Sequence, residues 1–159
     1  MAYDSHNLPC GEVFTAPVVD SVEGKVVFDV PMTISHRPVR DVELTFEGGE
    51  VVEYAAAQGE SAIAETLETD AGAKRLGELG IGMNRGIDRP TDRILFDEKM
   101  GGTVHMALGR AYASNFPEGR AEERNESAVH VDLIRRMDGG SRLEIDGEVV
   151  QEDGVFRWE

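Results

Sequence analysis

The chain of 159 residues is long enough for one domain, and 40% of its residues are hydrophobic, as in an ordinary soluble globular protein. No apolar run approaches the ~20 residues of a membrane span, and the N-terminus lacks the basic start and apolar stretch of a signal peptide, so we expect one cytoplasmic domain over residues 1–159. The formal net charge of -15 argues against nucleic-acid and membrane partners, because so acidic a surface repels phosphates and anionic lipid.

Strands dominate the first third of the chain. The stretch Val26–Val30 is rich in β-branched residues and is bounded by glycine and proline, which predicts a strand. The stretches Val42–Phe46 and Val51–Tyr54 flank a turn that contains Gly48 and Gly49. Because a Gly-Gly pair suits the tight turns that join antiparallel strands, the sequence predicts a hairpin here.

Two helices are predicted next. The stretches Ser61–Leu67 and Ala71–Leu76 are rich in alanine, glutamate and leucine, which favour helices. Asp70 is placed to cap the second helix at its N-terminus, and Gly77 is placed to end it.

Two later strands combine an apolar face with a histidine-bearing face. Side chains alternate between the two sides of a strand, so Thr103–Leu108 places three aliphatic residues on one side and His105 between small residues on the other. Ala128–Leu133 repeats this pattern and places His130 and Asp132 side by side opposite its apolar residues. A single histidine on a strand is more often a satisfied core or surface residue, and a His-x-Asp pair can be a hydrogen-bonded couple or a carboxylate that orients an imidazole.

A second hairpin is predicted near the C-terminus, where Leu143–Ile145 and Glu148–Val150 flank the turn signal Asp146-Gly147. With strands in the majority and helices between the hairpins, the predicted class is α+β, with a strand-rich, mixed, curved or barrel-like sheet and a few helices.

Two glutamates and a cysteine are possible additions to the histidines. Glu12 lies in a turn that enters an apolar stretch, and Glu78 lies among glycines and aliphatic residues, where an unpaired carboxylate is costly. Two roles for Glu78 remain open: it caps a helix or forms a salt bridge, or it binds a metal ion. Cys10 is either a thiol ligand or an incidental small residue; because it is the only cysteine, an intramolecular disulfide and a cysteine-rich zinc site are excluded.

Two histidines with three carboxylates form a ligand set that suits zinc, cobalt or manganese, and carboxylates can bridge two cations. Hydrolytic two-metal sites hold their ions roughly 3.5–4 Å apart, with a water molecule activated for attack. If these five side chains converge, coordination positions stay open for water and substrate.

Five motifs occur in order along the chain: Asn7–Pro17, Asp70–Glu78, Ile94–Gly109, Asn125–Asp132 and Asp146–Glu148. From about Asn7 to Phe156, this series resembles the thermophilic aminopeptidase family, the group that contains aminopeptidases T and S. The part of the family that it resembles is the C-terminal, metal-binding half.

The resemblance implies a cytosolic metallo-aminopeptidase that removes N-terminal residues from peptides with the help of two divalent metal ions, zinc, cobalt or manganese, and it favours a homodimer. The family's metal-binding positions fall on Glu12, Glu78, His105, His130 and Asp132. The resemblance leaves open which glutamate would bridge the metals, and it makes both Glu12 and Glu78 candidates for relaying the proton; Tyr112 would hydrogen-bond the oxyanion. Glu98 and Lys99 lie in the third motif and are expected to pair with each other.

The sequence departs from the family in three respects. Family members are typically more than twice as long, with an N-terminal α/β domain that we expect this chain to lack. Val131 stands where tryptophan is common, and the loop Ser114–Asn125 is unusually charged. The alternative is therefore a non-catalytic metal-binding relative, or a split subunit that needs a missing domain for activity. A purely acidic, salt-adapted binding module is a third reading, and it predicts no stoichiometric metal.

The acid excess has two interpretations. The carboxylates form either a functional cation-binding face or, as charge runs more often do, a solvated coat. Only three of the 16 basic residues are lysines, Lys25, Lys74 and Lys99. Acid excess with scarce lysine resembles proteins from salt-loving organisms.

This halophilic interpretation predicts a higher melting temperature in multimolar KCl than in low salt, because counterions screen the repulsion between surface carboxylates. Thermal melting followed by circular dichroism at both KCl concentrations measures the difference. Equal stability in the two solutions would rule out salt adaptation.

Overall fold

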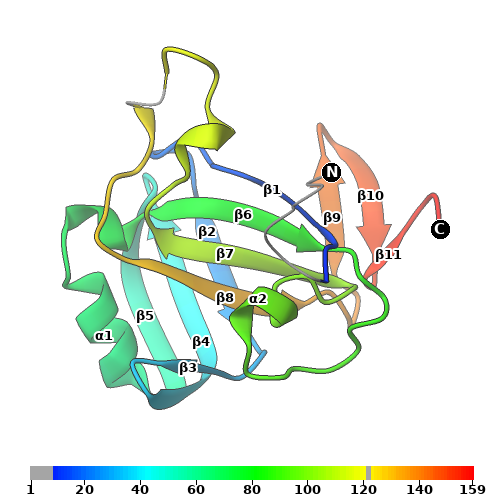
Figure 1. Ribbon diagram of the computed structural model, residues 1–159, viewed down its shortest axis with the longest axis horizontal. Helices are drawn as coiled ribbons and strands as arrows, with labels where there is room; N and C mark the ends of the chain where they lie inside the picture. The colour runs from blue at the N-terminus through cyan, green and yellow to red at the C-terminus, as the bar shows by residue number, and fades with distance from the viewer. Residues whose placement is uncertain (1–8, 121–122) are drawn as a thin grey trace.

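The computed structural model describes residues 9–120 and 123–159, which fold into three antiparallel sheets with short helices between them (Figure 1). Asn7 and Leu8 of the first motif, and residues 121–122 of the charged loop, lie outside the described residues. The predicted α+β class with a majority of strands is confirmed.

The first sheet carries the motif histidines and has the strand order β1-β6-β7-β8. Its strands are β1 (Glu12–Thr15), β6 (Leu76–Gly82), β7 (Thr103–Gly109) and β8 (His130–Arg136). Both histidine-bearing strands are therefore confirmed, and they pair with each other in antiparallel register.

The second sheet is built around β4 (Arg37–Glu47), which pairs with its three neighbours, β2 (Gly24–Phe28), β3 (Met32–Ile34) and β5 (Glu50–Gln58). The predicted hairpin is the β4–β5 connection. Gly48 and Gly49 both have positive φ, 54° and 80°, which explains why glycine suits this turn.

The third sheet has the order β11-β10-β9 and lies at one end of the molecule (Figure 1). It consists of β9 (Arg142–Ile145), β10 (Glu148–Glu152) and β11 (Val155–Phe156). The predicted Asp146-Gly147 turn joins β9 and β10, with positive φ at both residues.

The helical segments among the described residues are short: α1 (Glu60–Leu67), the 3-10 turn η1 (Ala71–Lys74), α2 (Ile94–Asp97) and the 3-10 turn η2 (Ala113–Asn115). The described residues include no helix with the length and apolar character that crossing a bilayer demands. The first predicted helix is confirmed as α1.

The second predicted helix, Ala71–Leu76, is wrong beyond its first turn. Asp70 does cap this turn, accepting a hydrogen bond from the Ala73 amide. However, the chain then becomes β6, in which Leu76 pairs with Leu108. Gly77 does not end a helix: an added Cβ there would lie 2.3 Å from the Gly109 carbonyl oxygen, so its lack of a side chain permits close strand contact. Tertiary pairing thus overrides local helix propensity.

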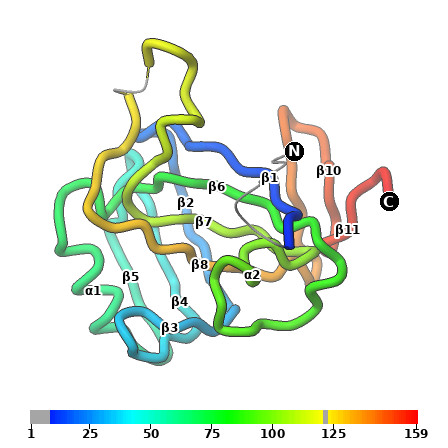
Figure 2. Tube along the Cα trace, in the orientation of Figure 1, coloured from blue at the N-terminus to red at the C-terminus, as the bar shows by residue number. Residues whose placement is uncertain are grey.

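The main core lies between the first and second sheets, whose strands cross in the trace of Figure 2. Leu76, Leu108 and Leu133 come from the first sheet and pack with residues of the second sheet and α1. Because strand residues alternate, Ala107 and Asp132, the sequence neighbours of Leu108 and Leu133, point to the opposite face of the first sheet. On β6 the register shift between Leu76 and Glu78 places Glu78 on that face as well. That opposite face carries the residues with metal-binding chemistry.

Asn125 ties the loop before β8 to the rest of the first sheet. Its side-chain amide is buried and donates to the carbonyl oxygens of Gly109, Gly72 and Arg75, at 2.6, 2.8 and 3.2 Å. This contact holds the start of β8, where His130 lies, against η1 and the end of β7.

Replacing Asn125 with alanine should lower the free energy of unfolding by about 1–3 kcal/mol, because buried carbonyl oxygens lose their donor. Chemical denaturation measures the change. Asn115→Ala is the matched control, since the Asn115 amide nitrogen has no hydrogen-bond partner among the described residues. An equal loss in both variants would contradict the role of Asn125.

Candidate metal centre

The five predicted metal ligands lie on one face of the first sheet, and we call them the ligand cluster: Glu12, Glu78, His105, His130 and Asp132. The strand register explains this placement. Gly80 lies opposite both Phe14 and His105, and Ala107 lies opposite Asp132, so small residues alternate with the larger polar ones on this face. The structure therefore brings together side chains that are 118 residues apart in sequence, from Glu12 to His130.

The first half of the ligand cluster surrounds the His105 ring. His105 is fully buried, and its Nε2 atom lies 3.3 Å from Glu78 Oε1 and 3.5 Å from Glu12 Oε2. One ligand atom from each of the three residues lies within 4.8 Å of the others.

The second half contains His130, Asp132 and again Glu78. His130 Nε2 lies 3.7 Å from Asp132 Oδ2 and 3.9 Å from Glu78 Oε2. The other ring nitrogen, Nδ1, lies 2.7 Å from the Arg110 carbonyl oxygen, which can only accept a hydrogen bond. This contact assigns the proton to Nδ1 and leaves the Nε2 lone pair facing the carboxylates, the arrangement that orients histidines at metal sites.

Glu78 belongs to both halves, with Oε1 toward His105 and Oε2 toward His130. It lies in β6 and not at a helix end, so the alternative of a helix-capping Glu78 is wrong. A carboxylate in this position has the geometry of a bridging ligand, since each oxygen faces a different group.

The ligand cluster fits a cation better than it fits an internal hydrogen-bond network. Buried Glu12 Oε2, Glu78 Oε2, Asp132 Oδ1 and His105 Nδ1 have no hydrogen-bond partner among the described residues, although such atoms are costly when unsatisfied. Ligand atoms around a tetrahedral zinc ion lie about 3.4 Å apart, given bonds near 2.1 Å. The separations of 3.3 to 3.9 Å between imidazole and carboxylate atoms match that spacing.

Gly80 provides the space in which the His105 ring lies. A Cβ atom added to Gly80 would lie 2.0 Å from His105 Nε2, a distance at which the imidazole must move. Gly80 is thus explained by the close approach of the His105 side chain from the neighbouring strand, whereas Gly77 is explained by the backbone of Gly109.

Lys99 lies next to the ligand cluster, and the sequence predicted only one of its two ion pairs. It pairs with Glu98, as expected, but its buried ammonium group also lies 2.9 Å from Glu12 Oε1. Glu12 therefore presents its other oxygen, Oε2, to His105. Burial alone would lower the pKa of Lys99, but hydrogen bonds to Glu98 and Glu12 outweigh it and raise the pKa, so the ammonium form is favoured.

Burial and neighbouring charges shift the pKa values of Glu98, Asp132 and His105. Burial is the largest influence on Glu98 and, despite Lys99, raises its pKa to about 7. Burial likewise raises the pKa of Asp132, against the opposing effect of His130 and His105. For His105, burial lowers the pKa but Glu78, Asp132 and Glu12 raise it by more. So concentrated a set of carboxylates favours any bound positive charge.

A cavity of about 550 Å³ opens over the ligand cluster. Its lining includes four of the cluster residues and Glu98, together with Phe14, Ile94, Leu95, Tyr112 and Ser114. The Tyr112 ring lies 5.0 Å from the His130 ring, and burial together with nearby carboxylates raises the pKa of its hydroxyl. Cys10 is exposed and is not grouped with the ligand cluster.

Comparison with known proteins assigns the family. The family of thermophilic metalloproteases (M29) matches residues 3–156 of the chain, and the chain belongs to this family. Among curated relatives, aminopeptidase T of Thermus aquaticus is 39% identical over 94% of the chain, and aminopeptidase 2 of Geobacillus stearothermophilus is 36% identical over 95%. The chain spans only 37% and 39% of the lengths of these relatives.

Solved structures agree with this assignment. Wild-type AmpT from Thermus thermophilus superposes with a TM-score of 0.83 at 34% identity, over 95% of this chain and 40% of that one. A 2,5-dihydroxypyridine dioxygenase from Pseudomonas putida KT2440 superposes with a TM-score of 0.63 at 18% identity, over 90% of this chain and 42% of that one. The second likeness shows that the fold is shared.

The Gly80→Ala variant should bind divalent cations about 10- to 100-fold more weakly than the unmodified chain, because the new methyl group displaces the His105 ring. Isothermal titration with zinc or cobalt measures the affinity. In the control Gly86→Ala, the added Cβ meets only Asn84 Oδ1, at 3.1 Å, and unchanged binding is expected. Undiminished affinity in Gly80→Ala would show that His105 is not a ligand.

Proposed function

We propose that this member of the thermophilic metalloprotease (M29) family is the metal-binding domain of an aminopeptidase and holds two divalent ions on the ligand cluster. One observation carries the proposal: Glu78 is shared by two groups of ligand atoms at the base of a single cavity. A carboxylate shared by two groups of ligand atoms can hold two cations close together, as dinuclear hydrolytic sites do.

The residues divide between two ion positions. Glu12 and His105 with one oxygen of Glu78 would hold the first ion, and His130 and Asp132 with the other oxygen would hold the second. Imidazole together with carboxylate suits zinc, cobalt or manganese. Two bound ions would supply an activated water nucleophile and polarise the scissile carbonyl group of a peptide.

The surrounding side chains supply the remaining chemistry. Tyr112 lines the cavity, and because its pKa is raised, its hydroxyl keeps its proton and can donate a hydrogen bond to a developing oxyanion. Glu12 and Glu78 are the proton acceptors that the sequence predicts. Glu98 joins them as a candidate, because it lines the same cavity yet stands outside both ligand groups.

The proposed substrates are peptides with a free N-terminus, as the names of the aminopeptidase relatives suggest. A cytoplasmic location and assembly into a homodimer are proposed on the resemblance to this family. The net charge of -15 supports the exclusion of nucleic acid and membrane surfaces as partners.

A second candidate is a non-catalytic metal-binding relative or a split subunit. The specific observation in its favour is that the chain spans about two fifths of the matched relatives, 37% and 39% of their lengths. Both candidate functions include the metal centre, but only the first predicts that the chain alone hydrolyses peptides.

The shared role of Glu78 predicts distinct metal contents for two variants. The unmodified chain should retain two ions, Glu78→Ala should retain none, and the double variant His130→Ala, Asp132→Ala should keep one, because only the second position is dismantled. Elemental mass spectrometry of protein purified without chelators measures the content. Glu53→Ala, an exposed position on β5, serves as control. Two ions retained by Glu78→Ala would refute the bridging assignment.

Hydrolysis of leucyl-p-nitroanilide tests the catalytic candidate. Turnover should require added cobalt, cease with a chelator, and fall by about 10²–10³-fold in Tyr112→Phe, since that variant loses an oxyanion donor. A chain that binds two ions but hydrolyses nothing supports the non-catalytic relative or the split subunit instead.

A further inference from the structure

Two aliphatic side chains of α2 stand exposed on the cavity wall. Ile94 is 36% and Leu95 is 53% exposed, and both line the cavity above the ligand cluster. We call these two residues the α2 wall. Apolar side chains in a concave, polar-floored site favour contact with an apolar part of a ligand, because contact removes both surfaces from water.

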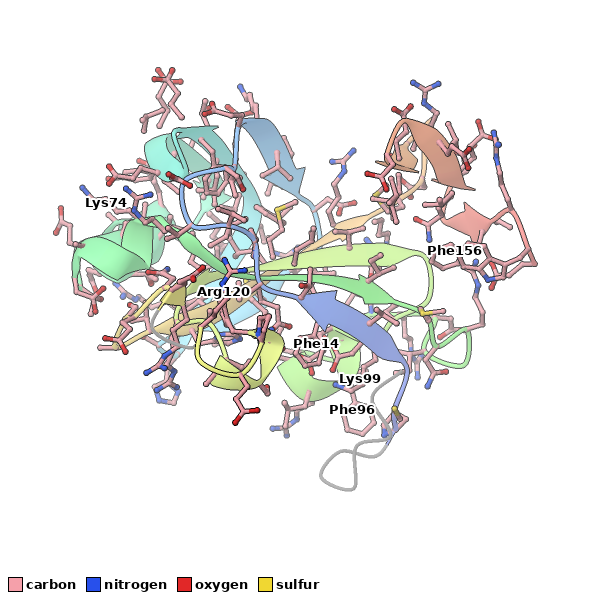
Figure 3. All side chains as sticks on the ribbon, turned by 90° about the horizontal axis from the view of Figure 1, so that it is seen from above. Phe14, Lys74, Phe96, Lys99, Arg120 and Phe156 are labelled. Carbon is pink, nitrogen blue, oxygen red and sulfur yellow. The ribbon has the colours of Figure 1, made fainter. Side chains whose placement is uncertain are left out.

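The α2 wall is held firmly relative to the ligand cluster. Asp97 is buried at the end of α2 and accepts hydrogen bonds from the Thr91 amide and hydroxyl, at 2.9 and 2.7 Å. Immediately after α2, Lys99 contacts Glu12. Figure 3 shows Lys99 next to α2. The end of the helix is thus bonded to the loop that precedes it, and the ion pair of Lys99 with Glu12 connects the helix to the ligand cluster.

Only one side of α2 faces the cavity. Ile94 and Glu98 are one helical turn apart, and both line the cavity, as residues four apart on a helix do. Phe96 is 41% exposed but lines a separate hollow with Pro9 and Asn84. Leu95 and Phe96 are both large, apolar and partly exposed, but Leu95 faces the cavity and Phe96 faces the separate hollow.

The base of the cavity has the opposite chemistry. Its lining contains four carboxylate side chains, Glu12, Glu78, Glu98 and Asp132. Among the described residues, the lining includes no lysine or arginine, so an acidic side chain that rested on the wall would lose its water shell without gaining a partner. An aliphatic side chain can rest on the same wall without that cost.

We propose that Ile94 and Leu95 determine specificity by receiving the side chain of the peptide's N-terminal residue, with large apolar residues preferred over alanine and aspartate rejected. This inference rests on the proposed aminopeptidase function and specifies its substrate class. The wall would contact the substrate through apolar surface alone, so changing the wall should alter the preference for large apolar over small N-terminal residues.

The experiment compares leucyl-, alanyl- and aspartyl-p-nitroanilide hydrolysis by the cobalt-loaded chain. The unmodified chain should prefer leucyl over alanyl substrate by about tenfold or more in kcat/KM. Ile94→Ser and Leu95→Ser should each reduce that ratio about fivefold, chiefly through KM, while Leu95→Met retains it. Phe96→Ser is the matched control and should keep the ratio of the unmodified chain. An unchanged ratio in both wall variants would overturn the inference.

Equilibrium binding separates this inference from the proposed function. Free leucine and alanine are not hydrolysed, so calorimetry of the cobalt-loaded chain measures their affinities even if turnover is absent. Tighter binding of leucine that is lost in Leu95→Ser, in protein whose circular dichroism is unchanged, supports the wall. Absence of metal uptake refutes the proposed function and with it the inference. Metal uptake with equal affinity for leucine and alanine, or with no binding of either, refutes the inference alone.

Discussion

In the β1-β6-β7-β8 sheet, the pairing of β6, β7 and β8 decides which side chains face the core and which face the cavity. Leu108 and Leu133 enter the main core, while their strand neighbours His105, Ala107 and Asp132 point the other way. A slip of one residue in any of these pairings would exchange the two faces, burying carboxylates among leucines. The hydrophobic core therefore specifies the register, and the register assembles the ligand cluster.

The same sheet concentrates charge at a cost to stability. Three carboxylates and two imidazoles share a largely buried space, and four of their atoms lack hydrogen-bond partners among the described residues. Lys99 compensates part of the negative charge, through Glu12 and Glu98, without entering either ligand group. Buried charges are tolerated when they are paired with an opposite charge or coordinate a metal. The arrangement thus makes sense as a site whose electrostatic balance is completed by bound cations.

The α2 segment connects chemistry with recognition. It lies between β6 and β7 in the chain, and four residues of helix carry the exposed wall, followed directly by Glu98 and Lys99. Asp97 bonds the end of the helix to Thr91, and Lys99 reaches Glu12, so direct contacts connect the apolar surface with the acidic base of the cavity. In the proposed aminopeptidase, this segment would position the substrate side chain relative to the scissile bond, which is how binding energy contributes to orientation.

The sequence by itself determined the two glycine-turn hairpins, the helix α1 and the alternating faces of β7 and β8, because each depends on local backbone geometry or on a two-residue period. Its ordered motifs also named the five candidate ligands, by resemblance. Tertiary structure decided what local sequence signals do not determine. Leu76 lies in a strand and not in the predicted helix because it pairs with Leu108. Glu78 is shared by the two groups of ligand atoms because β6 lies between β1 and β7. The reach of Lys99 to Glu12, and the different directions of Leu95 and Phe96, likewise depend on packing between segments distant in sequence.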